Sequence, residues 1–147
     1  MVIMGIRPEM IKLAPVIREA QRRVDKIELL ICSTGQHREM LDQALTVFNI
    51  SPSIKLDVMH ENQTLSGLTA RLIDGLSNVM IDNKSDFAVV QGDATTTFTA
   101  SLAVFYQHIP VAHVEAGLRT GNMDSPFPEE LNRVMIARIA QWHFTPT

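Results

Sequence analysis

Cysteine is nearly absent from this sequence, which has Cys32 as its single thiol. A disulfide framework is therefore excluded, and such a chain suits a reducing compartment such as the cytoplasm. Cys32 lies in an apolar, strand-like run, where a buried and unreactive thiol is the better interpretation than a nucleophile. We therefore expect a cytoplasmic protein in which Cys32 contributes to packing.

An excess of basic residues and a long apolar run are also missing. The chain has 13 Lys and Arg against 16 Asp and Glu, and its formal net charge is −3. Nucleic-acid-binding domains usually carry a basic stripe, so this balance predicts no nucleic-acid partner. No apolar run is long enough to span a bilayer, and the N-terminus lacks the pattern of a secretory signal. We therefore expect no membrane association.

Two phosphate-binding motifs are missing as well. The sequence contains neither G-x-G-x-x-G nor G-x-x-x-x-G-K. Nothing in it therefore indicates binding of a dinucleotide cofactor or of ATP.

What the sequence does contain is a regular alternation of strand-like and helix-like segments over 147 residues, a length typical of one domain. The predicted strands cover residues 2–5, 27–32, 54–59, 87–91, 111–114 and 142–145. The predicted helices cover residues 8–23, 37–48, 64–83, 95–107 and 128–140, with Thr64 as a cap. The strands are apolar on both faces, which predicts an α/β domain with a parallel sheet covered by helices on both sides.

Polar side chains follow four of these strands at the point where each strand ends. Because the carboxyl ends of parallel strands lie at one edge of a sheet, we expect these side chains to form a ligand-binding edge. They are Arg7 and Lys12, then Gln36, His37 and Arg38, then Gly92 and Asp93, and finally His113, Glu115 and Arg119, with Glu129 opening the next helix.

Arg7 and Lys12 flank the first turn of the helix that follows the first strand. Exposed N–H groups of a helix and two cations together favour a phosphate or diphosphate. The competing interpretation is a pair of solvated surface side chains. That interpretation is weakened because Arg7 lies in the strand-to-helix turn itself.

Gly92 and Asp93 stand at the end of a predicted strand, just before a run of threonines. Gly92 allows a ligand to approach the backbone, which would bring it close to Asp93. Asp93 is equally well explained as the N-cap of the following helix. The segment alone leaves both interpretations open.

His113 and Glu115 are two residues apart, so they share a face of the sheet if the strand continues through both. Glu115 would then orient or charge the imidazole, although a single histidine at a strand end is more often structural.

Two carboxylates, Glu129 and Glu130, follow Pro128 in the first turn of a predicted helix. The helix dipole favours them there, and Glu129 is expected to pair with Arg133. A carboxylate held in this way tends to a low pKa, which suits a base or a charge stabiliser better than a proton donor.

Taken together, these segments resemble the non-hydrolysing UDP-N-acetylglucosamine 2-epimerases of bacteria, and the likeness runs from end to end of the sequence. Each motif is weak alone, but their shared order makes the resemblance specific. The motifs are Gly5-Ile6-Arg7-Pro8-Glu9 with Lys12, Gln36-His37-Arg38-Glu39-Met40-Leu41-Asp42, Gly92-Asp93-Ala94-Thr95-Thr96-Thr97, His113-Val114-Glu115-Ala116-Gly117-Leu118-Arg119-Thr120 and Pro128-Glu129-Glu130-Leu131-Asn132-Arg133.

The resemblance implies a Rossmann-like domain that forms one half of a glycosyltransferase-B-like architecture, with a UDP-sugar bound between two domains. The family interconverts UDP-N-acetylglucosamine and UDP-N-acetylmannosamine by eliminating UDP to give 2-acetamidoglucal and then adding UDP back. It uses no metal and no redox cofactor. The intact enzyme is expected to be a homodimer that supplies precursors of cell-surface polysaccharides.

The resemblance also implies roles for individual residues, transferred by motif match. The implied catalytic carboxylates are Asp93, Glu115 and Glu129. The implied substrate contacts are Arg7, Lys12, Asp93 and Glu115, and an effector site is implied at Gln36 and Glu39. Supporting roles are implied for His113, Arg119 and Arg133.

The sequence departs from the family in two residues and in length. Ile6 and Ala94 stand where the family usually has Thr, so each lacks a hydroxyl that could contact ligand or cap a helix. The family continues into a second domain that supplies much of the nucleotide pocket. Residues 1–147 are therefore expected to be a truncated, N-terminal domain with negligible activity alone. A non-catalytic remnant that binds a UDP-sugar or a partner, and a glycosyltransferase acceptor domain, stay open as alternatives.

Overall fold

A computed structural model of the chain describes residues 1–35, 38–60 and 62–146. Within these residues one sheet has the strand order β3-β2-β1-β4-β5-β6, and every strand pair is parallel. The strands are β1 (Val2–Met4), β2 (Ile31–Ser33), β3 (Ile54–Lys55), β4 (Ala88–Gln91), β5 (Val111–Val114) and β6 (Trp142–Phe144). The helices are α1 (Arg7–Arg22), α2 (Arg38–Phe48), α3 (Leu65–Asp82), α4 (Thr95–Tyr106) and α5 (Glu129–Ile139).

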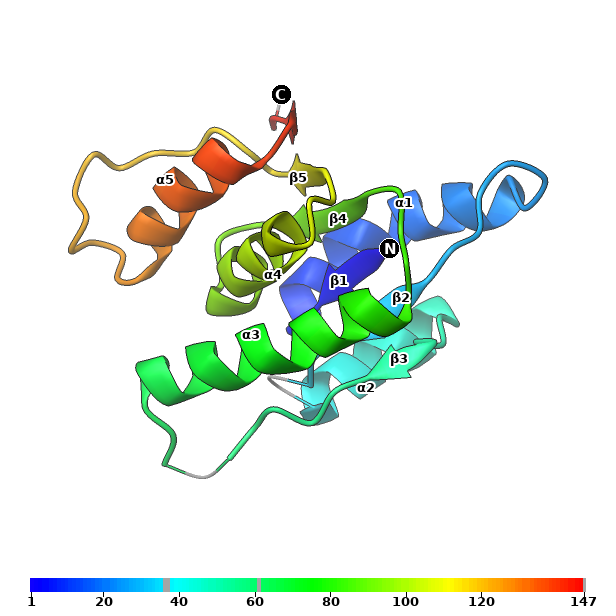
Figure 1. Ribbon diagram of the computed structural model, residues 1–147, viewed down its shortest axis with the longest axis horizontal. Helices are drawn as coiled ribbons and strands as arrows, with labels where there is room; N and C mark the ends of the chain where they lie inside the picture. The colour runs from blue at the N-terminus through cyan, green and yellow to red at the C-terminus, as the bar shows by residue number, and fades with distance from the viewer. Residues whose placement is uncertain (36–37, 61, 147) are drawn as a thin grey trace.

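Helices cover both faces of this sheet. Successive strand residues point to opposite sides, and the apolar residues on each side pack against helices. In β1, Val2 and Met4 pack with residues of α1 and α2, whereas Ile3 packs with residues of α3 and α4. α5 lies next to α4 on the second of these faces. Figure 1 shows the N-terminus at β1, inside the sheet, and the C-terminus at its far side beyond β5. The predicted Rossmann-like parallel sheet with helices on both faces is therefore confirmed.

Five of the six strands are shorter than predicted, and the difference is large in two of them. The strand expected at 27–32 is found at Ile31–Ser33, because Ile31 is the first residue that faces a residue of β1, namely Val2. Before it, the amide of Ile27 donates to the carbonyl of Arg23 at 2.8 Å, as in a turn that closes α1. The strand expected at 54–59 pairs only through Ile54 and Lys55, at the edge of the sheet. In both cases the strand is limited to the residues that pair with a neighbouring strand.

Helix α3 begins where the sequence predicts. The hydroxyl of Thr64 accepts a hydrogen bond from the amide of Gly67 at 3.1 Å, so Thr64 is its N-cap. No helix in the described ranges combines the length and the apolar character that a membrane crossing requires.

Candidate functional site

The turn between β1 and α1 places two cations at the carboxyl edge of the sheet. Gly5 is enclosed there, since a Cβ atom would lie 2.4 Å from the hydroxyl oxygen of Thr34. Arg7 begins α1 and is exposed, and its guanidinium pairs with none of the described residues. Lys12 lies further along the same helix and forms an ion pair with Glu115. Arg7 and the N-terminus of α1 are therefore available to an anion.

Glu115 follows β5 and is held from two sides. Its carboxylate accepts a hydrogen bond from the side-chain amide of Gln91, at the end of β4, and pairs with Lys12 of α1. The backbone of Glu115 has a φ of 65°, in the left-handed region that residues with a side chain seldom adopt. This carboxylate is thus fixed at the point where β4, β5 and α1 meet.

The expectation that His113 and Glu115 share a face requires a strand that continues through both residues. β5 ends at Val114, so this condition is not met. The imidazole is 2% exposed, and its Nε2 lies 2.7 Å from the carbonyl oxygen of Gly92. Because a carbonyl can only accept, Nε2 donates, and Nδ1 is left without a partner in the described part of the chain. Burial lowers the pKa of His113. His113 therefore holds the turn after β4 as a neutral ring.

Asp93 is bound by Arg133 of α5 rather than capping α4. Both Nε and Nη2 of Arg133 reach the same oxygen of Asp93, at 2.8 and 2.7 Å. The N-cap position of α4 is taken by Ala94, which has no hydroxyl to offer. The side-chain amide of Asn132 donates to the backbone carbonyl of Asp93 at 2.8 Å. The N-cap interpretation is therefore wrong, and these contacts attach the start of α5 to the end of β4.

The predicted pair between Glu129 and Arg133 is also wrong. Arg133 uses Nη1 to bind Glu130, at 3.1 Å, in addition to its contacts with Asp93. Glu130 is buried and accepts a further hydrogen bond from the amide of Gly121 at 3.0 Å. Burial opposes its ionisation, but the backbone hydrogen bonds and Arg133 outweigh burial and lower the pKa of Glu130. Glu130 thus anchors the preceding loop, whereas the half-buried Glu129 opens α5.

Glu9, in the first turn of α1, is a buried carboxylate at this edge whose contacts the sequence does not predict. It is 2% exposed, and its carboxylate accepts from the amides of Gly5 and Ile6 at 2.6 and 3.0 Å. The hydroxyl of Thr97 lies 2.9 Å from its other oxygen. Burial raises the pKa of Glu9 to about 7, despite these hydrogen bonds. A glutamate at the third position of a helix, which can bond back to its own N-cap, was the available signal.

Arg119 is a further predicted residue, and its positive charge disfavours protonation of His113. Arg119 is exposed and donates to the carbonyl of its neighbour Leu118 at 2.6 Å. Of the two predicted effector residues, Gln36 lies outside the described residues, and Glu39 belongs to α2 without a described side chain. Within the described ranges no three side chains of His, Cys, Asp or Glu are grouped so that they could hold a metal ion.

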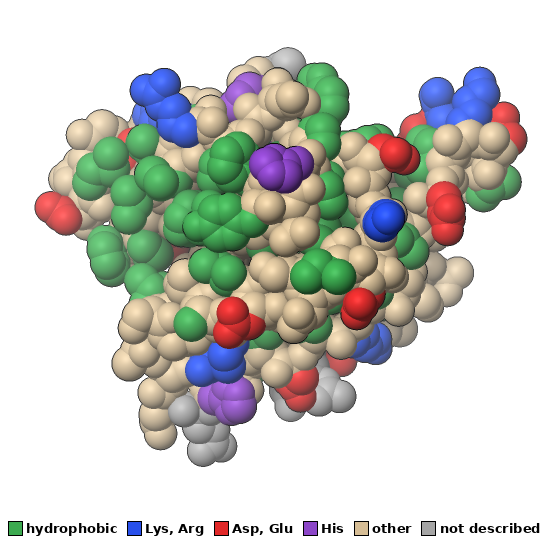
Figure 2. Space-filling view, viewed as in Figure 1, with side chains coloured by type: hydrophobic (Ala, Val, Ile, Leu, Met, Phe, Trp, Pro, Cys, Tyr) green, Lys and Arg blue, Asp and Glu red, His purple; other side chains and the backbone are tan. Residues whose placement is uncertain are grey.

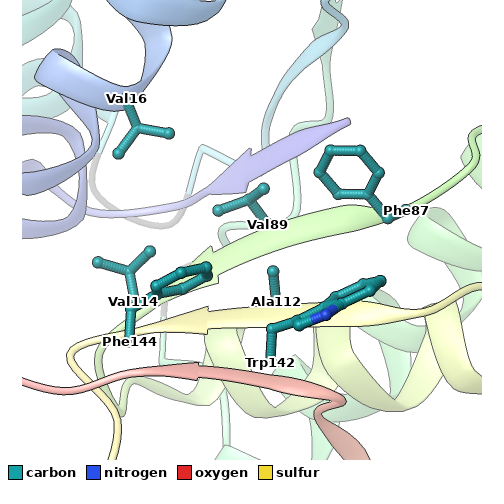
Figure 3. Close-up of a pocket in the computed structure, with 7 residues that line it drawn as sticks. All are labelled: Val16, Phe87, Val89, Ala112, Val114, Trp142 and Phe144. Carbon is teal, nitrogen blue, oxygen red and sulfur yellow. The ribbon is translucent and has the colours of Figure 1, made fainter.

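An apolar groove of about 570 Å³ lies on the sheet face that carries α1, beside β4, β5 and β6 (Figure 3). Its lining contains no ionisable side chain and consists of Val16, Phe87, Val89, Ala112, Val114, Trp142 and Phe144. Hydrophobic side chains also gather over the region of α5 (Figure 2), where Leu131 and Met135 are exposed. The groove therefore offers no acid–base group, unlike the charged edge.

Known proteins are similar to this chain in both sequence and fold. A family model described as UDP-N-acetylglucosamine 2-epimerase matches residues 19–147. The UDP-N-acetylglucosamine 2-epimerase of Neisseria meningitidis is 52% identical over 145 residues, which are 99% of this chain and 39% of that protein. The corresponding protein of Salmonella typhimurium is 50% identical, over 99% of this chain and 38% of its own length.

Solved structures agree with these matches. The crystal structure of the Neisseria meningitidis enzyme bound to UDP-GlcNAc superposes with a TM-score of 0.95 at 52% identity, and 99% of this chain covers 39% of that chain. An enzyme from Methanocaldococcus jannaschii, in complex with UDP-GlcNAc and UDP, superposes with a TM-score of 0.92 at 34% identity, over 99% of this chain and 40% of that one. The chain therefore spans about two fifths of the length of these relatives, and it belongs to the UDP-N-acetylglucosamine 2-epimerase family.

Proposed function

We propose that residues 1–147 form the N-terminal, Rossmann-like domain of a cytoplasmic UDP-N-acetylglucosamine 2-epimerase, one half of a two-domain cleft. The observation that carries this proposal is the position of Glu115. Lys12 and Gln91 hold its carboxylate at the edge where Arg133 holds Asp93. Relatives at 52% and 34% identity were crystallised with UDP-GlcNAc, which supports the same substrate class for this chain.

The diphosphate of the substrate is assigned to the N-terminus of α1. Arg7 is exposed there, at the positive end of the helix dipole. Lys12 lies further along the same helix and already pairs with a carboxylate. Together these cations would stabilise the negative charge that develops on UDP as it departs.

The proposed reaction has two steps that reverse each other. A carboxylate removes the proton from C2 of the sugar, the electron pair of that C–H bond forms the C1=C2 bond, and the C1–O bond breaks with its electrons leaving on UDP. UDP then adds back to C1 of 2-acetamidoglucal while C2 receives a proton on the opposite face. Asp93, Glu115 and Glu129 are the proposed catalytic carboxylates, serving as base and as stabilisers of positive charge at C1.

The test is a chimera in which residues 1–147 replace the matching part of the Neisseria meningitidis relative. We expect it to interconvert the two UDP-sugars and to incorporate deuterium at C2 in D2O, as read by NMR. Glu115→Gln should lower kcat by about a hundredfold or more. The matched control is Glu19→Gln, because Glu19 is an exposed residue of α1.

Three outcomes of this test would contradict the proposal. A folded chimera that releases free sugar or transfers it would indicate a glycosyltransferase. A chimera that binds the substrate without exchanging the C2 proton would indicate a non-catalytic module. Full activity in Glu115→Gln would remove that residue from the reaction.

The 147-residue chain alone is expected to show negligible turnover, since it spans about two fifths of its relatives. We also propose that the intact enzyme is a homodimer. Turnover by the isolated chain at the rate of the chimera would contradict the two-domain cleft.

A further inference from the structure

Glu9 of α1 is buried, and its carboxyl group connects this helix to the turn after β1 and to the start of α4. One carboxylate oxygen accepts from the amides of Gly5 and Ile6, in the turn that delivers Arg7. The other lies 2.9 Å from the hydroxyl of Thr97, in the first turn of α4. An isolated carboxylate costs several kcal/mol to bury, so a neutral form or a full set of donors is required here.

Thr97 has a single hydroxyl hydrogen but two neighbours that could accept it. Its oxygen lies 2.9 Å from the carboxyl of Glu9 and 2.8 Å from the backbone carbonyl of Gln91. If Glu9 is protonated, its O–H donates to Thr97 and Thr97 donates to Gln91, so every group is satisfied. If Glu9 is ionised, Thr97 turns its hydrogen to Glu9, and the carbonyl of Gln91 loses that donor.

Gln91 links the hydrogen bond of Thr97 to the candidate catalytic carboxylate of Glu115, because it contacts both residues. Its side-chain amide donates to Glu115, which also pairs with Lys12. Charged groups on the surrounding elements include Arg7 and Lys12 on α1, Glu115 after β5, and Asp93 after β4, which pairs with Arg133 of α5. Asp93 acts on Glu9 through space and disfavours its ionised form.

We propose that Glu9 is a positioning residue for Glu115, acting through the hydroxyl of Thr97 and the amide of Gln91. Glu9 contacts neither substrate nor reacting atoms in this scheme. Its protonation state sets the hydrogen bonds at the end of β4, and the end of β4 carries the amide that orients Glu115. The role assigned to Glu115 rests on the proposed epimerase function, whereas the connection itself does not.

The connection can be measured by NMR on the isotopically labelled 147-residue chain, without any ligand. The carboxyl carbon of Glu9 and the side-chain amide of Gln91 are followed from about pH 4 to about pH 9. We expect the Gln91 amide to shift with the same midpoint near pH 7 as Glu9 itself. In Glu9→Gln the Gln91 amide should lose this step. Failure of the chain to bind a UDP-sugar would leave the result unaffected.

A second variant separates the connection from folding. Thr97→Val should leave Glu9 titrating while the Gln91 amide no longer follows, and Thr97→Ser should restore the response. Thr99→Val is the matched control, because Thr99 is a buried threonine of α4 that bonds back to the carbonyl of Thr95. A Gln91 amide with no step near pH 7, or one that follows Glu9 equally in Thr97→Val, would overturn the proposal.

Discussion

Arg133 binds a single carboxylate oxygen of Asp93 with two nitrogens, at 2.7 and 2.8 Å. The two residues are 40 positions apart in the sequence. The same guanidinium reaches Glu130 with its third nitrogen. Because these contacts need several donors in one plane, arginine suits the position better than lysine does. The contact fixes α5, and with it Glu129, against the end of β4.

Replacing Arg133 by Lys keeps the charge and removes the planar set of donors. We expect the free energy of unfolding to fall by about 1.5 to 3 kcal/mol, the usual contribution of a hydrogen bond to a charged group, as measured by urea denaturation. Arg138→Lys is the control, since Arg138 is exposed in the last turn of the same helix. An equal loss in both variants would show that the contact with Asp93 contributes nothing specific.

Ala94→Thr is expected to stabilise the protein. Ala94 is the N-cap of α4 with an extended backbone, φ −63° and ψ 161°, and it has no side-chain oxygen for the free amides of the first turn. A threonine hydroxyl there should raise the free energy of unfolding by about 1 kcal/mol. Ala94→Val adds a side chain of the same shape without the hydroxyl. If valine stabilises as much as threonine, capping is not the cause.

The sequence predicts the elements well where their signal is local. The strand expected at 111–114 is found at Val111–Val114. All four residues pair with β4, and the last three also pair with β6. The strand expected at 27–32 is shortened, because its apolar residues before Leu30 face no part of β1. Hydrophobicity identifies a strand, but only the neighbouring strand sets its length.

The candidate site is predicted as a collection of residues and not as a set of contacts. Strand ends identify Asp93 and Glu115, since the carboxyl ends of parallel strands lie at one edge of the sheet. The partners of these residues come from other elements, such as Arg133 for Asp93 and Lys12 for Glu115. The burial of Glu9 depends on Thr97, 88 residues away in the sequence. A local sequence pattern cannot predict contacts between residues so far apart in the sequence.

The ring of His113 is expected to be a neutral, Nε2-protonated tautomer throughout the neutral range. Its Nε2 donates to Gly92, and a second proton would place an N–H at Nδ1 with no acceptor among the described residues. Two-bond 1H–15N correlation spectra distinguish the tautomers, with the exposed His108 as a comparison in the same sample. A charged ring at pH 7, or protonation at Nδ1, would contradict this assignment.

Glu9 should make the protein less stable as the pH rises from about 4.5 to about 7. Its pKa is raised from 4.5 to about 7 in the folded chain, so in this window the folded state holds a proton that the unfolded state has released. The contribution is complete below pH 4.5 and is lost as the pH rises through 7. Its size is on the order of 3 kcal/mol, from 1.36 kcal/mol for each pH unit.

Comparison of variants separates the effect of Glu9 on stability from that of His113. The lowered pKa of His113 makes the folded state more stable as the pH rises toward 6.5, which is the opposite of the effect of Glu9. The free energy of unfolding is measured in urea between about pH 4.5 and about pH 8 for the wild type, Glu9→Gln and Glu19→Gln. Both variants retain His113, so the difference from the wild type cancels its effect. We expect that difference to change with pH for Glu9→Gln, because Glu9 is buried, whereas Glu19→Gln controls for the loss of a carboxylate on the exposed face of α1. A flat difference for Glu9→Gln would mean that the buried carboxyl is already ionised at pH 5, stabilised by the amides of Gly5 and Ile6.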